Sequence, residues 1–257
     1  MTQMIIKGCA GLAIGNMTKS ILISRAQDAG ERPMPPEIRI FNEDCLSAMQ
    51  NMKDRQYDLA IVDPPYRVAM TGRKSPANGF KGVQEWDKMR LGWDQQRPGP
   101  EYFNELFRVS KNQIVWGANY FTERLPPSMG WVFWYKMQDN FSFSDGEFAF
   151  TSFHSKARIF KYGRGMESGF APGGCAYPNI HPTQKPVRLY EWLLKNYAKQ
   201  GDRILDTHLG SGSIAIACEI MGYDLDGYEI DKEYYDAASK RLERHRRQSV
   251  FQFEAAR

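Results

Sequence analysis

The sequence predicts an α/β fold with a parallel sheet whose strands follow the chain in a permuted order. A short apolar run at 59–62 indicates a buried parallel strand. A second buried strand, 203–206, leads through the turn Gly210-Ser211-Gly212-Ser213 into an apolar helix at 214–221, as in nucleotide-binding folds. Such a fold needs a further strand, but after Glu229 there is room only for one helix and a short tail. The remaining strands must therefore come from upstream, which makes the fold circularly permuted.

The individual elements follow from the apolar runs and their spacing. Strands are expected near 38–41, 58–62, 113–116, 131–135, 147–152, 157–161, 203–206 and 226–230. Helices are expected near 43–51, 100–109, 187–199, 213–221 and 232–246. We expect residues 1–36 to form an N-terminal extension of unknown role and residues 37–257 to form a single domain.

The stretch 67–100 has no steady hydrophobic period and carries several glycines together with Trp86 and Trp93. A segment of this length without regular structure is usually functional or mobile. Because it directly follows the strand at 58–62, we expect it to be a mobile loop that closes over a ligand. The alternative is an ordinary packed excursion of the chain.

Composition is compatible with one sizeable core and a polyanionic partner. The chain has 257 residues, of which 42% are hydrophobic, and a net charge of +4. An acid-free basic run between the central strands and the last third of the chain is a candidate for phosphate contacts. It consists of Lys156, Arg158, Lys161 and Arg164. A second basic cluster, at 240–247 in the last helix, is more typical of a solvated helix face.

The cysteines and histidines favour neither a metal site nor disulfides. The four cysteines are widely spaced without a C-x-x-C pair, and the histidines lack ligand spacing. This pattern is typical of a reducing compartment. No apolar run approaches the length of a membrane span. We therefore expect a cytoplasmic protein with no metal and no membrane partner.

The most informative motif is Asp63-Pro64-Pro65-Tyr66, which follows the strand at 59–62. Open α/β sheets bind ligands at this end of their strands. The two prolines fix the backbone and remove two N–H donors, while their carbonyls still accept hydrogen bonds. Asp63 and the Pro64 carbonyl suit an exocyclic amino group, and the Tyr66 ring suits a planar base. A rigid turn would explain a bare Pro-Pro pair, but the flanking acid and tyrosine favour base binding.

Three further motifs show that the chain resembles the β-class, or permuted, amino-group DNA methyltransferases, in the small form of phages and prophages. Residues 42–46 resemble the family's D-C-L block, and 116–121 resemble its W-G-G-N-Y-F block. His181-Pro182-Thr183-Gln184-Lys185-Pro186 matches its H-P-T-Q-K-P block. The resemblance extends over about 38–242. It implies a Rossmann-like S-adenosylmethionine-dependent methyltransferase fold with the catalytic loop before the cofactor loop.

The resemblance implies transfer of a methyl group from S-adenosylmethionine to the N6 amino group of a flipped-out adenine in double-stranded DNA. Asp63, Pro64, Pro65 and Tyr66 would form the catalytic loop, and the segment at about 154–180 would recognise the target. Asp44 would bind the cofactor's adenine, Glu229 its ribose, and Thr183 and Lys185 its carboxylate. The full expected cofactor set is Asp44, Cys45, Asp63, His181, Thr183, Lys185, Asp206, His208, Gly210, Ser211, Gly212, Glu229 and Ile230.

Two alternatives to adenine methylation stay open at this point. One is N4-cytosine methylation, although the family more often carries serine at position 63 for cytosine. The other is a DNA-binding regulator with impaired catalysis, because His208 stands where the family usually has phenylalanine. His208 would either act as a flat ring that makes cofactor binding pH-dependent or fill the space as a neutral side chain.

The resemblance also implies partners. It suggests a homodimer, encoded by a bacterium or phage, and allows a restriction endonuclease on a separate chain.

Overall fold

The computed structural model describes residues 35–66, 97–138, 144–163 and 184–255, with side chains up to residue 248. These residues belong to one compact unit, Pro35–Arg257. The predicted N-terminal extension and most of the predicted loop at 67–100 lie outside the described residues. The predicted recognition segment at 154–180 is described as far as residue 163.

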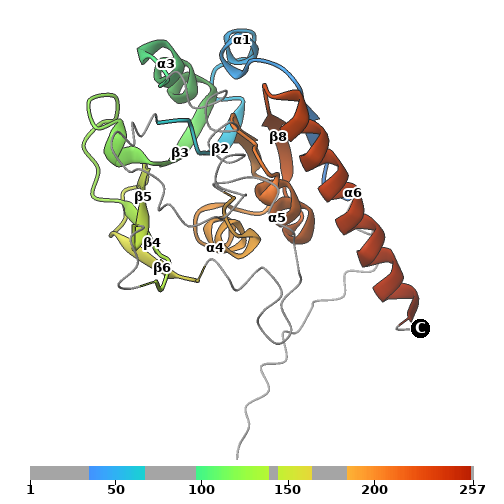
Figure 1. Ribbon diagram of the computed structural model, residues 1–257. Helices are drawn as coiled ribbons and strands as arrows, with labels where there is room; N and C mark the ends of the chain where they lie inside the picture. The colour runs from blue at the N-terminus through green and yellow to red at the C-terminus, as the bar shows by residue number, and fades with distance from the viewer. Residues whose placement is uncertain (1–34, 67–96, 139–143, 164–183, 256–257) are drawn as a thin grey trace, which may run out of the picture. The chain divides into compact units, whose positions relative to one another are not determined.

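The described residues form an eight-stranded sheet in the order β1-β8-β7-β2-β3-β5-β4-β6 (Figure 1). The strands are β1 (Ile38–Phe41), β2 (Tyr57–Val62), β3 (Ser110–Trp116), β4 (Trp131–Tyr135), β5 (Gly146–Thr151), β6 (Arg158–Lys161), β7 (Arg203–Asp206) and β8 (Asp224–Tyr228). Among these strands, only β5 runs antiparallel to its neighbours; the other pairs are parallel.

The late strands β7 and β8 lie between the early strands β1 and β2. The expectation that upstream strands complete the sheet beside the glycine turn is therefore confirmed, since Leu59 of β2 pairs with Ile204 of β7. The description of this order as a circular permutation of the family's fold rests on the resemblance and stays a prediction.

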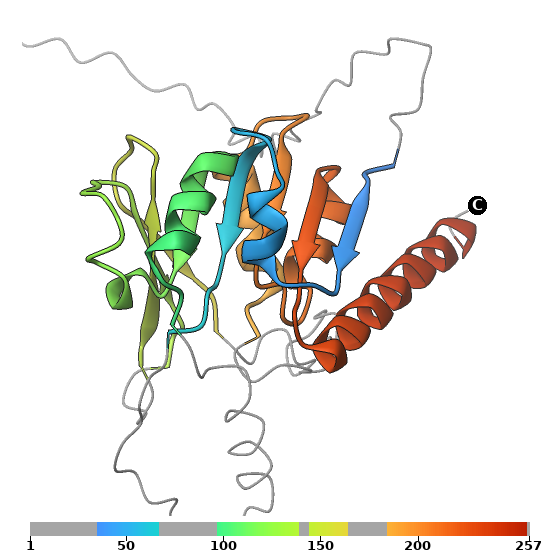
Figure 2. The ribbon, with the colours of Figure 1, turned by 90° about the horizontal axis from the view of Figure 1, so that it is seen from above.

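Helices cover both faces of the sheet (Figure 1). The helices are α1 (Cys45–Gln50), α3 (Pro100–Val109), the short 3-10 helix η1 (Ala118–Tyr120), α4 (Val187–Tyr197), α5 (Ser213–Met221) and α6 (Lys232–Ala255). Helices α1 and α3 pack with one face, and α4 and α5 pack with the other. Figure 2 shows α6, in red, beyond β1, in blue, at one end of the sheet.

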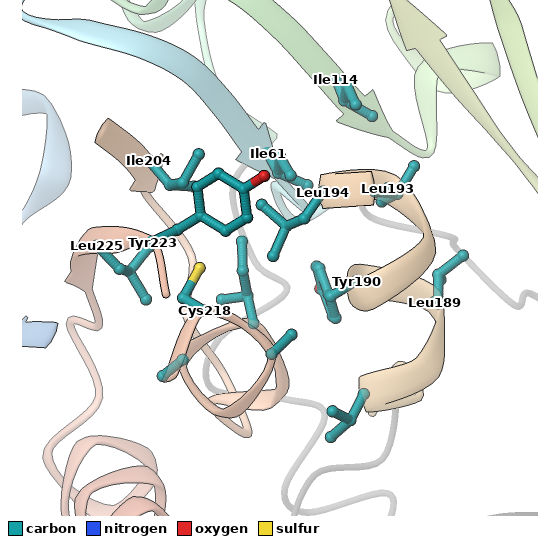
Figure 3. Packing of buried hydrophobic residues seen from close by; sticks show 14 of the residues in the cluster. Ile61, Ile114, Leu189, Tyr190, Leu193, Leu194, Ile204, Cys218, Tyr223 and Leu225 are labelled. Atoms are coloured by element: carbon teal, nitrogen blue, oxygen red, sulfur yellow. The ribbon is translucent and has the colours of Figure 1, made fainter. Parts of the chain in front are cut away.

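Helix α4 shows why this layer forms. Its apolar residues recur at helical spacing, so that one stripe faces the sheet. Figure 3 shows this stripe meeting side chains from α5 and from four strands, all buried. The labelled residues are Ile61, Ile114, Leu189, Tyr190, Leu193, Leu194, Ile204, Cys218, Tyr223 and Leu225. Full burial of each large aliphatic side chain contributes roughly 1.5–3 kcal/mol, which holds the layer against the parallel strands.

Several element bounds differ from those predicted by two residues or more; β3, for example, begins at Ser110 instead of 113. The last strand was expected at 226–230 but lies at Asp224–Tyr228, so that Glu229 and Ile230 follow it. It begins earlier because polar Asp224 anchors it, accepting a hydrogen bond from the Glu37 N–H at 2.8 Å. The last helix extends to Ala255 instead of 246, because no glycine or proline interrupts the chain there.

In these four ranges, no helix combines the length and apolar character needed to cross a membrane. The same residues bring no three His, Cys, Asp or Glu side chains into an arrangement that would hold a metal ion.

Candidate active site

The site lies where the parallel strands end. Asp63 follows β2, Gly117 follows β3, Asp206 ends β7 and Glu229 follows β8. Because β7, β2 and β3 are neighbours in the sheet, these residues come to the same edge. Lys136 follows β4 there as well, and Glu147, near the start of the antiparallel strand β5, reaches this edge from the other direction.

Asp63 is held by an ion pair. Its Oδ2 pairs with the Lys185 ammonium, which lies just before α4 and is 2% exposed. Its Oδ1 is buried and accepts no hydrogen bond from the described residues. Burial raises the pKa of Asp63, and Lys185 opposes that rise. One carboxyl oxygen is therefore fixed, while the other remains available as an acceptor.

Two further charged side chains, Glu147 and Lys136, extend this ion pair beyond Lys185. Its ammonium also lies 3.2 Å from Glu147 Oε2, and the Lys136 ammonium lies 2.6 Å from Glu147 Oε1. Burial disfavours the charged form of Glu147, but Lys185 and Lys136 outweigh it and lower its pKa to about 2. Likewise, burial disfavours charged Lys185, but Asp63 and Glu147 raise its pKa. The sequence predicted that Lys185 would reach the cofactor's carboxylate; in the structure it contacts two carboxylates of the chain itself.

Tyr66 packs flat against the chain. Its ring stacks on Tyr120, with centroids 4.6 Å apart and planes 5° apart. A Cβ at Gly117 would meet the Tyr66 ring at 2.5 Å, and Gly117 has φ +64, so that only glycine fits there. Tyr120 therefore covers one face of the Tyr66 ring, and the stacking of a base on Tyr66 stays a prediction.

The glycine turn is fixed from two sides. Glu229 accepts hydrogen bonds from the N–H of Gly210 at 2.8 Å and of Asp231 at 2.9 Å. From α6, the buried Arg241 donates to the Ser211 carbonyl at 2.8 Å and to Ser213 Oγ at 2.9 Å. Burial raises the pKa of Glu229. The turn predicted from its glycines is therefore held by two charged side chains, Glu229 and Arg241, which lie far from it in sequence.

Asp206 and His208 lie beside this turn. Asp206 is buried and accepts a hydrogen bond from the His208 N–H at 3.0 Å. Burial raises its pKa to about 8. Burial lowers the pKa of His208 to about 4, and its Nδ1 lies 2.9 Å from Thr207 Oγ1, which in turn lies 2.7 Å from the Tyr102 hydroxyl. His208 is thus neutral near pH 7, which favours the interpretation of it as an uncharged side chain filling the space.

The other predicted cofactor residues spread along this edge. Asp44 caps α1 by accepting from the Ser47 N–H at 2.8 Å. Cys45 opens that helix, and burial raises the pKa of its thiol to about 12. Ile230 is 66% exposed. His181 and Thr183 lie outside the described residues.

The predicted DNA contacts divide across the sheet. Lys161 ends β6, which runs parallel to β4, and so lies at the same sheet edge as Asp63. Lys156 is exposed and precedes β6, so it lies toward the opposite edge. Arg158 hydrogen-bonds to Asn196 and lies over the Trp192 ring at 5.8 Å, which gives it a packing partner on α4. Arg164 lies outside the described residues.

Sequence reasoning missed five residues of the site: Lys136, Tyr102, Tyr120, Glu147 and Arg241. Four of the five are isolated in the sequence, without a motif around them that names their partner. Tyr120 lies within the block at 116–121 and Lys136 directly follows the strand expected at 131–135, so their position at the sheet edge could have been inferred. Glu147 carried a weaker signal, an acid in an otherwise apolar strand.

Comparisons with known proteins identify the family of the chain. The N6/N4 methyltransferase family, described as DNA methylase, matches residues 70–240. The Type II methyltransferase M.HpaI of Haemophilus parainfluenzae is 25% identical over 244 residues, covering 80% of this chain and 74% of that protein. The putative methylase YubD of Escherichia coli K12 is 26% identical over 222 residues, covering 79% and 89%.

Solved structures show the fold. TTHA0409, a putative DNA modification methylase from Thermus thermophilus solved with S-adenosyl-L-methionine, is 15% identical with a TM-score of 0.50, covering 81% of this chain and 95% of that one. The PvuII DNA methyltransferase, which is cytosine-N4-specific, is 12% identical with a TM-score of 0.55, covering 80% and 86%. The predicted Rossmann-like methyltransferase fold is therefore confirmed. The family match spans more than half of the length of this chain. The chain therefore belongs to the N6/N4 family of DNA methylases.

Proposed function

We propose that this chain transfers a methyl group from S-adenosylmethionine to the N6 amino group of an adenine flipped out of double-stranded DNA. The observation that carries the proposal is the state of Asp63. Its Oδ2 is fixed by Lys185, while its buried Oδ1 accepts no hydrogen bond from the described residues. A buried acceptor of this kind needs a donor, and an exocyclic N–H group of a base supplies one.

The chemistry follows from the weak nucleophilicity of the amino group, whose lone pair is delocalised into the ring. Asp63 Oδ1 and the Pro64 carbonyl accept from the two N6–H groups and stabilise the positive charge that develops on nitrogen. Pro65 keeps this turn rigid. Flipping the base costs a few kcal/mol, and the Tyr66 ring offsets part of that cost once the base takes the place of Tyr120.

The residues around the glycine turn fit S-adenosylmethionine, which supplies the methyl group on its sulfonium when bound. The buried carboxyl of Asp206 suits a cationic ligand, which would favour its ionised form. Glu229 would accept hydrogen bonds from the ribose hydroxyls. The backbone of Gly210 and Gly212 would shape the methionine side, and Asp44 would accept from the adenine amino group. His181 and Thr183 also belong to the set predicted from the sequence.

Adenine is the preferred base because position 63 carries aspartate. The family model covers both N6 and N4 enzymes, and N4-cytosine methylation uses the same kind of amino group. A direct test is to incubate the protein with S-adenosylmethionine and unmethylated double-stranded DNA, digest the DNA to nucleosides and identify the product by mass spectrometry. We expect N6-methyldeoxyadenosine; N4-methyldeoxycytidine would establish the alternative, and no methylated base would support a regulator with impaired catalysis.

Asp63→Ala should abolish methyl transfer in this assay while leaving the dissociation constant for S-adenosylmethionine within about threefold, because Asp63 acts mainly on the base. Calorimetry measures the binding, and the nucleoside assay measures the product. Turnover near that of the unmodified protein would contradict the role given to Asp63.

A further inference from the structure

We propose that Glu147 and Lys136 are positioning residues for methyl transfer, acting on Asp63 through Lys185. The inference rests on the proposed function, because it assumes that Asp63 receives the amino group of the base. It adds two side chains that need not touch base or cofactor.

The geometry that carries the proposal is a row of four side chains with alternating charges, which come from four parts of the fold. The order is Asp63, Lys185, Glu147, Lys136. Their segments are far apart in sequence: the end of β2, the residues before α4, the start of β5 and the end of β4. The row of charged side chains therefore runs along the sheet edge past the end of β3, which lies between β2 and β5.

Burial makes these charges depend on one another. The side chains of Lys185 and Lys136 are 2% and 6% exposed, and those of Asp63 and Glu147 are 19% and 22% exposed. An unpaired buried charge would cost several kcal/mol, but two cations and two carboxylates balance. Aromatic rings support the cations as well, with Lys185 5.3 Å from the Trp116 centroid and Lys136 5.2 Å from the Trp134 centroid.

The sharing of the Lys185 ammonium gives Glu147 its effect on Asp63. With Glu147 3.2 Å away, Lys185 only partly neutralises Asp63, which stays a strong acceptor for charge developing on the base. If Glu147 lost its charge, Lys185 would pair with Asp63 alone, lower its pKa and weaken it as an acceptor. If Lys136 lost its charge, Glu147 would draw Lys185 away from Asp63. The two changes therefore act on the pKa of Asp63 in opposite directions.

The signs agree with the electrostatics around Asp63, where Glu147 raises its pKa and Lys136 lowers it. The titratable groups that face Asp63 also include residues of β7, α3 and α4. Among the described residues, the set is Lys185, Glu147, Lys136, Asp206, Tyr102 and Tyr190. The other members remain unchanged in the variants. If the pKa of Asp63 shifts in opposite directions in the two variants, the shifts are therefore due to Glu147 and Lys136.

The experiment compares Glu147→Gln, Lys136→Met and Lys136→Arg with the unmodified protein. Single-turnover methyl transfer is measured from pH 5 to 9, S-adenosylmethionine binding by calorimetry and stability by thermal unfolding. Glu219→Gln is the matched control: Glu219 is 21% exposed and pairs with Arg246 at 2.6 Å, away from the site. It reports what the loss of a half-buried ion pair does by itself.

We expect Glu147→Gln to lower the single-turnover rate about 10- to 100-fold with cofactor binding within about threefold. The acidic limb of its pH profile should move to lower pH. Lys136→Met should move that limb to higher pH, and Lys136→Arg should restore the original profile. Glu219→Gln should leave rate and profile unchanged.

Two kinds of failure are distinguishable. If the unmodified protein methylates no base, the proposed function fails. If it methylates adenine but the site variants keep its rate and profile, only the positioning role is wrong; a rate loss without a change in profile means that the charges only stabilise the fold. Should Glu147→Gln not fold, the Lys136 pair still decides, because Lys136→Met without a profile shift contradicts the proposal.

Discussion

His208 shows how one residue's surroundings decide its role. The family usually has phenylalanine at this position, and the histidine ring takes that place beside Tyr102, with ring centroids 5.4 Å apart. Burial lowers its pKa from 6.5 to about 4, so it carries no charge across the neutral range. Of the two interpretations that the sequence leaves open, the structure favours the neutral side chain over a switch for cofactor binding.

This histidine should instead limit stability in acid. The folded state binds fewer protons than the unfolded state between pH 6.5 and 4, so its contribution is intact above pH 6.5 and is lost as pH falls toward 4. His208→Phe should reduce the loss of unfolding free energy on going from pH 7 to pH 5 by about 1–2 kcal/mol, measured by urea unfolding at both values. Equal losses in the variant and the unmodified protein would show that other groups govern the acid side.

Residues in contiguous motifs could be predicted from the sequence, and residues joined only by the fold could not. Asp63 stood out because it opens a motif directly after a predicted strand, and Glu229 because it lay on the strand predicted after the glycine turn. Glu147 and Lys136 are eleven positions apart (147 minus 136), and nothing in the sequence shows that they pair with each other or that Glu147 also meets Lys185. Tyr120 was part of a recognised block, but only the fold shows that its ring lies on Tyr66.

Among the elements, α6 has a role that its charge pattern concealed. Its basic residues suggested a solvated face, yet Arg241 is 3% exposed and donates to the Ser211 carbonyl and the Ser213 hydroxyl. Gly212, with φ +70, has no Cβ, and one there would lie 3.1 Å from the Ala238 Cβ of α6. The last helix therefore fixes the conformation of the glycine turn. The sequence of the turn alone indicates only that its backbone is flexible.

Arg241→Met should loosen this turn. Leaving the Ser211 carbonyl without its buried donor costs about 1–3 kcal/mol of unfolding free energy, and a looser turn should bind S-adenosylmethionine about three- to tenfold more weakly. Arg244→Met, at an exposed position of the same helix, is the control and should stay within about 0.5 kcal/mol. Thermal unfolding and calorimetry measure the two effects. A variant that loses stability but binds the cofactor normally would make Arg241 a residue of the fold alone.

On the scale of the whole molecule, the sheet brings residues from the first and last thirds of the chain to one edge. The parallel order β8-β7-β2-β3 sets Glu229 and Asp206 beside Asp63, so that cofactor and base are expected to meet between β7 and β2. This arrangement was predictable from chain order, because the glycine turn had too few strands after it. The packing of β6 on α4 was not, since Arg158 gave a basic signal and its contacts with Trp192 and Asn196 depend on the fold.

The way in which the protein would recognise DNA favours an assembly of two copies of the chain. The predicted recognition segment is only about 154–180, and Lys161 is its one described basic residue at the site edge. Each discriminated base pair is worth about 1–3 kcal/mol, so a single copy with few contacts reads a short site. A two-fold dimer doubles the contacts without lengthening the chain and suits a palindromic site. We therefore expect a homodimer, in which one subunit methylates while the other adds DNA contacts.

Light scattering at micromolar concentration should give twice the chain mass of 29.6 kDa. On duplexes that keep one target adenine and are shortened from both ends, affinity should fall before the length that one subunit covers is reached, because the second subunit then loses its phosphate contacts. Lys161→Ala should weaken binding to long duplexes and reduce its salt dependence, whereas Lys156→Ala, toward the other sheet edge, should do so less. A mass of one chain both with and without DNA would contradict the dimer, and recognition would then have to come from a single subunit.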